Sequence, residues 1–148
     1  MKKSTWAGFH IGMLLFATCL FRCQPSSPHP ALLGTWKMSA QENLETGVMT
    51  AEPVHLARSV LIEFDGKPHK GHVYIQTVVN HIQGRFQISE GQHIHFFDLT
   101  GGLQGEPAWS KDLWQNLEGT ERFIHKGKEL MLVSKSHQVK TIWEKVEK

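Results

Sequence analysis

Two histidines, His93 and His95, have a spacing that could hold a metal ion. In an extended strand, residues two apart lie on the same face, so their rings would be about 7 Å apart, and imidazole is a common ligand of zinc and copper. His69 and His72 are the candidate further ligands. Because apolar residues alternate with His93 and His95, we favour a strand whose histidines face solvent, and we keep metal binding as the alternative.

Residues suited to catalysis form no recognisable group. Both cysteines of the chain lie within its first 23 residues, and the sequence contains neither a Gly-x-Ser-x-Gly elbow nor a His-Glu-x-x-His motif. Asp65, Asp98 and Asp112 fall at ordinary turn or helix positions. We therefore expect a protein that is not an enzyme, has no catalytic residues and uses no cofactor.

The two cysteines, Cys19 and Cys23, could instead carry lipid. Residues 20–22 resemble the short box that precedes the acylated cysteine of bacterial lipoproteins, although Arg22 departs from it. Residues 24–30 contain three prolines and two serines, a composition typical of a flexible tether. We favour acylation at Cys23, with acylation at Cys19 and simple secretion as alternatives.

The segment before Cys23 has the plan of a signal peptide. Lys2 and Lys3 precede an apolar run over residues 6–20, which is too short for a membrane span of about 20 apolar residues. We predict a lipoprotein-type signal peptide over 1–23, a tether over 24–31 and one domain over 32–148. The expected location is the bacterial cell envelope, at the outer membrane, with membrane contact through the lipid.

The charge of the domain argues against nucleic acid as a partner. The whole chain carries a formal charge of +2, with 16 basic and 14 acidic residues. Without Lys2, Lys3 and Arg22, 13 basic residues face 14 acidic ones, a charge of −1. A nucleic-acid binder needs a basic patch to displace counterions from phosphates, and the lysines here are scattered.

The domain is predicted to be mainly β, a barrel or a sandwich, and a barrel would give the C-terminal hairpins strand partners and remove exposed edges. Turn residues recur every eight to twelve positions, and one segment instead has helical spacing, with Trp109, Leu113 and Leu117 at i, i+4 and i+8. That pattern predicts one short helix near 108–118. The predicted strands are 33–38, 59–64, 72–79, 85–89, 92–99, 121–125, 129–134 and 138–146.

Three segments carry a family resemblance: the opening 33–36 (Leu-Gly-Thr-Trp), the central segment 78–86 and the later Leu-x-Leu strand at 130–132. In their order with the other elements, they resemble the META/HslJ family of bacterial envelope domains. The resemblance implies a small lipocalin/calycin-like antiparallel β-barrel with one helix, and a role in the envelope, in stress or drug tolerance. The residues that match the family motif, and for which we favour structural roles, are Gly34, Trp36, Asn80, Gly84 and Phe86.

The sequence thus predicts a non-enzymatic envelope lipoprotein that binds or stabilises an envelope partner. One alternative is a lipocalin-like carrier of a small apolar ligand, because an eight-stranded barrel can be either filled or hollow. The residues that could line its mouth are Trp36, Phe86, Phe96 and Trp143. The other alternative is the metal-binding domain at His93 and His95.

Overall fold

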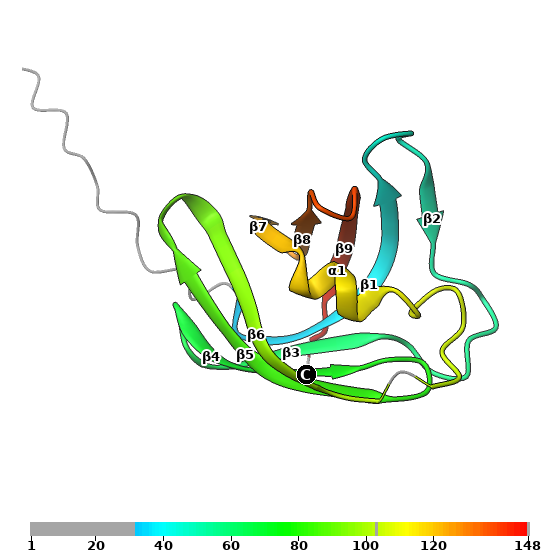
Figure 1. The fold of residues 1–148 in the computed structure, drawn as a ribbon, viewed down its shortest axis with the longest axis horizontal. Helices are drawn as coiled ribbons and strands as arrows, with labels where there is room; N and C mark the ends of the chain where they lie inside the picture. Colours follow the sequence, from blue (N-terminus) through cyan, green and yellow to red (C-terminus); the bar gives the residue numbers. More distant parts are fainter. Residues whose placement is uncertain (1–31, 103, 148) are drawn as a thin grey trace, which may run out of the picture.

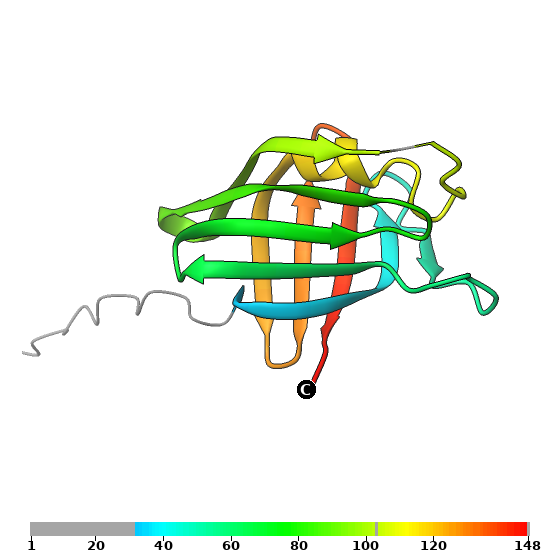
Figure 2. The ribbon, with the colours of Figure 1, turned by 90° about the horizontal axis from the view of Figure 1, so that it is seen from below.

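A closed antiparallel β-barrel forms the domain, as a computed structural model describes it for residues 32–102 and 104–147 (Figures 1 and 2). Each strand pairs with the next along the barrel, and β1 closes it by pairing with β9. The elements are β1 (Gly34–Asn43), β2 (Met49–Ala51), β3 (Leu61–Lys67), β4 (Lys70–Gln76), β5 (His81–Ser89), β6 (His93–Gly101), α1 (Leu113–Glu118), β7 (Thr120–Lys126), β8 (Glu129–Ser134) and β9 (Val139–Lys145). The predicted mainly β barrel with one short helix is confirmed.

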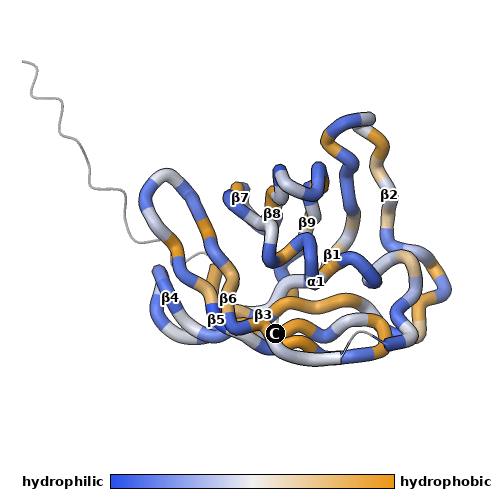
Figure 3. The backbone as a smooth tube through the Cα atoms, viewed as in Figure 1, coloured by the Kyte–Doolittle hydropathy of each residue, from blue (hydrophilic) through white to orange (hydrophobic). Residues whose placement is uncertain are grey.

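Apolar side chains fill the inside of the barrel. Along β3 to β6, buried apolar residues alternate with exposed ones, the period-two pattern of a sheet with one buried face (Figure 3). Phe64 and Phe86 meet edge to face inside, with ring centroids 5.2 Å apart. The largest side chains that are almost fully buried are Trp36, Trp143, Phe64, Phe86, Phe96 and Phe123.

Bulges bend the strands enough for the sheet to close. The register shifts between Met38 and Ala40 where β1 pairs with β9, and between Gln83 and Arg85 where β5 pairs with β6. Such irregularities increase the local twist and re-aim a strand. β2 pairs with β1 alone and stands outside the ring.

The junction between β6 and β7 is the weakest part of the ring. A single registered pair, His93 with Arg122, joins the two strands. The helix α1 lies beside this junction and contacts β6 and β8 (Figure 1). It buries Leu113 and Leu117 in the barrel core. Apolar side chains of the helix therefore cover the core where β6 and β7 share only one registered pair.

The helix is shorter than the sequence predicts. It begins at Leu113, whereas the predicted helix near 108–118 began five residues earlier. Residues 108–112 form turns in which the N–H groups of Ser110 and Lys111 both donate to the carbonyl of Pro107, each at 3.0 Å. The hydroxyl of Ser110 donates a hydrogen bond to the carboxylate of Glu106. The apolar spacing was right, but a competing local hydrogen bond moved the start of the helix.

Two strand boundaries differ from the prediction by four or five residues. β5 begins at His81, although residues 80–84 were predicted to connect two strands, and β1 continues to Asn43. Gly84 therefore lies within a strand, where it is tolerated because a bulge faces it.

Among the described residues, no helix has the length and apolar character to cross a membrane. The predicted signal peptide, tether and acylated cysteine lie outside the described residues.

Candidate functional site

The carboxylate of Glu106 holds two loops together at one end of the barrel. Glu106 accepts hydrogen bonds through Oε1 from the N–H of Val79 at 3.2 Å and from the N–H and side-chain amide of Asn80 at 2.8 and 2.7 Å. The hydroxyl of Thr77 also donates to Oε1, and that of Ser110 donates to Oε2. Glu106 thus joins the β4–β5 loop to the segment that precedes α1.

The donors around Glu106 favour its charged form. Partial burial on its own raises the pKa of Glu106, but the hydrogen bonds from Ser110, Thr77 and Asn80 outweigh burial and lower that pKa from 4.5 to about 2. Hydrogen bonds to a charged carboxylate are among the stronger ones in proteins. Glu106 is therefore an ionised acceptor at neutral pH, which suits a structural link and not a general acid.

Arg58 also binds the β4–β5 loop. Its guanidinium donates to the carbonyl oxygens of Val78 and Asn80, each at 2.9 Å, and its third contact is Nε2 of His81 at 3.3 Å. Asn80, a predicted motif residue, also donates to the carbonyl of Gln104 at 2.9 Å. These contacts make Asn80 the centre of a hydrogen-bonded loop.

The opening motif lies at the other end of the barrel. Trp36 is fully buried and donates its indole N–H to the carbonyl of Leu32 at 2.8 Å, while the ammonium of Lys145 lies 4.4 Å from its ring centroid. Burial lowers the pKa of Lys145. Gly34 has a φ of 105°, and a Cβ there would lie 2.8 Å from Nζ of Lys145. Gly34 and Trp36 therefore shape this end of the barrel.

The structure places Gly84 and Phe86 on β5. Phe86 is fully buried in the core. At Gly84, a Cβ would lie 2.5 Å from Cδ2 of Leu99 and 3.1 Å from the carbonyl oxygen of Phe97, because β6 bulges toward it. Both residues pack within the protein.

His93 and His95 lie exposed on β6, with Ile94 between them buried in the core. The ring of His95 stacks on Phe97, with centroids 5.9 Å apart and planes 13° apart. Within residues 32–102 and 104–147, no group of three or more His, Cys, Asp or Glu side chains could hold a metal ion. Metal binding at this pair stays a prediction.

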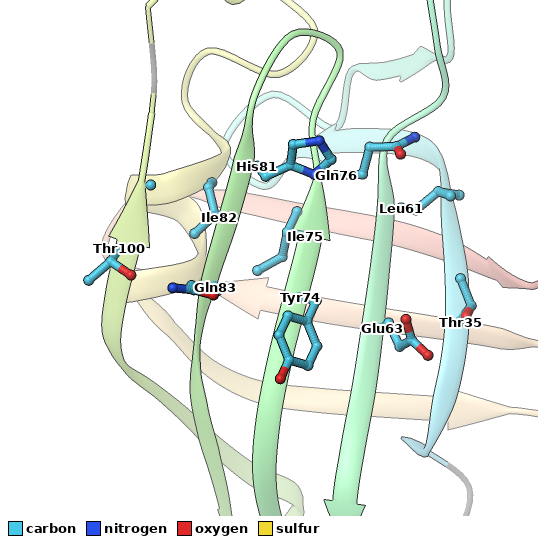
Figure 4. Close-up of a pocket in the computed structure, with 11 residues that line it drawn as sticks. Thr35, Leu61, Glu63, Tyr74, Ile75, Gln76, His81, Ile82, Gln83 and Thr100 are labelled. Carbon is cyan, nitrogen blue, oxygen red and sulfur yellow. The ribbon is translucent and has the colours of Figure 1, made fainter.

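A hollow lies on the outer face of the barrel, across β1, β3, β4, β5 and β6 (Figure 4). We call it the outer hollow; its volume is about 510 Å³. Tyr74 stands in it between Glu63 and Gln83, which come from the strands on either side. Its lining residues are Thr35, Leu61, Glu63, Tyr74, Ile75, Gln76, His81, Ile82, Gln83, Thr100 and Gly101.

Sequence reasoning missed both Glu106 and the outer hollow. Glu106 stands between Gly105 and Pro107, where composition indicates only a loop. The outer hollow depends on strand register, which brings residues from five strands together. One signal in the sequence could have indicated the outer hollow. Tyr74 is an aromatic residue at one of the alternating positions of β3 to β5 that face solvent.

Comparisons with solved structures support the fold. The chain is similar to an NMR structure of a protein from Burkholderia xenovorans (14% identity, TM-score 0.65, 100% of both chains covered). It is also similar to the crystal structure of a DUF4847 family protein from Bacteroides vulgatus (12% identity, TM-score 0.53, 79% of this chain and 95% of that one). At such identities the likeness extends to the fold alone. No protein-family model and no curated protein matches the chain.

Proposed function

We propose that this chain is an exported, lipid-anchored protein of the bacterial envelope that binds a ligand on the outer face of its barrel and catalyses no reaction. The N-terminal segment, with its basic start, apolar run and Cys23, supports export and anchoring. Acylation with more than one chain would suffice for stable attachment to a membrane. The barrel would then stand on the tether 24–31 and present its surface to the envelope.

One observation carries the choice of the outer face: the interior is filled by large buried side chains, whereas the outer face has a hollow of about 510 Å³. Trp36, Phe86 and Trp143 are 0% exposed and Phe96 is 2% exposed, so the residues that would line a carrier's mouth occupy its interior. A ligand inside would have to displace them from a close-packed core. The outer hollow, by contrast, is formed without any rearrangement.

We keep the META/HslJ resemblance and the metal site within the proposal. The META/HslJ resemblance implies a small barrel with one helix. The observed barrel supports this resemblance, as it would support that of any other family of barrels of this size. A role in stress or drug tolerance rests on that resemblance alone. For metal binding through His93 and His95, no described third ligand adds support.

Site-directed photo-crosslinking tests the outer-face proposal. A photoreactive residue replaces Thr100, in the outer hollow, or Lys135, an exposed residue in the β8–β9 turn, and living bacteria that express the full chain are irradiated. We expect an adduct with envelope material, glycan or protein, at position 100 and none at 135. Equal adducts at both positions, or none at 100, would contradict the proposal.

A further inference from the structure

Strand pairing sets a row of polar side chains around one tyrosine on the outer face. Across β1, β3, β4, β5 and β6, the register places five outward residues opposite one another in sequence: Thr35, Glu63, Tyr74, Gln83 and Thr100. Side chains directly opposite on neighbouring strands lie about 5 Å apart at Cβ. Glu63, Tyr74 and Gln83 therefore span about 10 Å.

Tyr74 is the exposed aromatic residue of this face. Its exposed fraction is 47%, and among the described Trp, Phe and Tyr residues it is the only exposed one. Figure 4 shows its ring between Glu63 and Gln83, at one edge of the outer hollow. An exposed tyrosine offers a flat apolar surface together with a hydroxyl that both donates and accepts hydrogen bonds.

The two neighbours of Tyr74 have hydrogen-bonding groups that the protein itself does not use. Within the described part of the chain, the side chains of Glu63, Tyr74 and Gln83 make no hydrogen bond or ion pair. A carboxylate offers two acceptor oxygens, and an amide offers one acceptor and two donors in a plane. Such planar groups can bind two adjacent hydroxyls of one ligand.

The lining chemistry excludes several classes of ligand. An apolar ligand would bury Glu63 and Gln83 without partners, which costs about 1–3 kcal/mol for each group. An anionic ligand would meet no Lys or Arg among the lining residues and would face the charge of Glu63. A stable protein interface needs about 800 Å² on each side with an apolar centre, whereas Tyr74 is the one large apolar side chain exposed on this row.

We infer that the outer hollow binds a neutral carbohydrate, with one sugar ring stacked on Tyr74 and its hydroxyls bound by Glu63 and Gln83. A sugar ring presents C–H groups on one face and hydroxyls around its edge, which matches an aromatic ring flanked by planar polar groups. The volume of about 510 Å³ lies in the range of small-ligand sites. This inference rests on the proposed outer-face binding and names its ligand class.

A second hollow of about 300 Å³ extends this surface along β4, β5 and β6. It shares Tyr74, Gln83 and Thr100 with the outer hollow and adds Arg85, which is paired with Asp98. The two hollows lie on either side of the same residues, so a chain of sugars could pass over Tyr74 from one to the other. We therefore expect oligosaccharides to bind more tightly than monosaccharides.

Titration of the full chain in detergent with neutral tetrasaccharides tests the inference. The sugars are cellotetraose, maltotetraose and N-acetylchitotetraose, with tetragalacturonate as the anionic comparison, and binding is followed by isothermal calorimetry. We expect at least one neutral sugar to bind and tetragalacturonate not to bind. Tyr74→Ala should weaken binding at least tenfold, and Tyr74→Phe, which keeps the ring, should change it less than threefold.

Gln83→Ala and Gln87→Ala form a matched pair. Both residues are exposed on β5, but Gln87 lines neither hollow. We expect Gln83→Ala to weaken sugar binding at least fivefold and Gln87→Ala to leave it unchanged, with equal thermal midpoints showing that both variants fold. Absence of binding by every neutral sugar, or binding that Tyr74→Ala leaves intact, would overturn the inference. If no sugar binds while position 100 still crosslinks to an envelope protein, the ligand class is wrong and the outer-face proposal stands.

Discussion

The carboxylate of Glu106 accepts hydrogen bonds from both the backbone N–H and the side-chain amide of Asn80, at 2.8 and 2.7 Å. The two residues are 26 positions apart, in the β4–β5 loop and in the segment before α1. Their contact ties the β4–β5 loop, directly before the start of β5, to the segment before α1. The strand that carries Gln83 into the outer hollow therefore starts from a hydrogen-bonded anchor.

Glu106→Gln should destabilise the fold at neutral pH and lose this effect in acid. Because the folded-state pKa of Glu106 is lowered from 4.5 to about 2, its contribution is complete above about pH 4.5 and is lost as the pH falls toward 2. We expect a loss of about 1–3 kcal/mol in the free energy of unfolding at pH 7. Urea unfolding of both proteins at pH 7, 4 and 3 measures it. A difference that stays constant over this range would show that the charge of Glu106 does not matter.

Phe86→Ala should open a cavity in a barrel that is otherwise filled. Phe86 is fully buried and packs edge to face on Phe64, so its truncation should cost about 3–5 kcal/mol. If the variant folds, we expect it to bind an apolar fluorophore that the wild type does not bind. The control is Phe97→Ala, at a half-buried outward position on β6, which should cost less and bind no fluorophore. Equal fluorophore binding by the wild type would mean that the barrel already contains a cavity.

Gly84→Ala should destabilise the protein because the β5–β6 pairing leaves no room for a methyl group. The added Cβ would meet Cδ2 of Leu99 at 2.5 Å and the backbone oxygen of Phe97 at 3.1 Å. Overpacking of this kind costs about 1–3 kcal/mol. The exposed Gln87→Ala on the same strand should change stability by less than about 0.5 kcal/mol. Thermal unfolding compares the two variants, and equal midpoints would refute the steric argument.

Cys23→Ala should abolish incorporation of labelled palmitate into the chain in bacteria. Cys23 precedes the proline-rich tether, which is the position expected of an acylated N-terminus. The wild type and Cys19→Ala should both incorporate label. Label that persists in Cys23→Ala and disappears in Cys19→Ala would assign the anchor to Cys19, and no label in any of the three would favour simple secretion.

The sequence predicted the strands well because their buried faces alternate with period two. Pairs of apolar residues two positions apart, such as Ile62 and Phe64, indicate a strand from the local sequence alone. The predicted start of α1 was wrong because residues 108–112 form turns and Ser110 binds Glu106, a hydrogen bond that the apolar spacing does not reveal. The outer hollow escaped prediction for another reason: Glu63, Tyr74 and Gln83 become neighbours only through the register of three strands.

Native mass spectrometry of the full chain, purified from bacterial envelopes and then extracted with organic solvent, tests the central claim that ligands bind outside a filled barrel. Because Trp36, Phe86, Phe96 and Trp143 occupy the interior, we expect the chain with its covalent lipid and no extractable apolar compound. A stoichiometric apolar molecule released by solvent would contradict the claim and would show that the barrel opens to carry it.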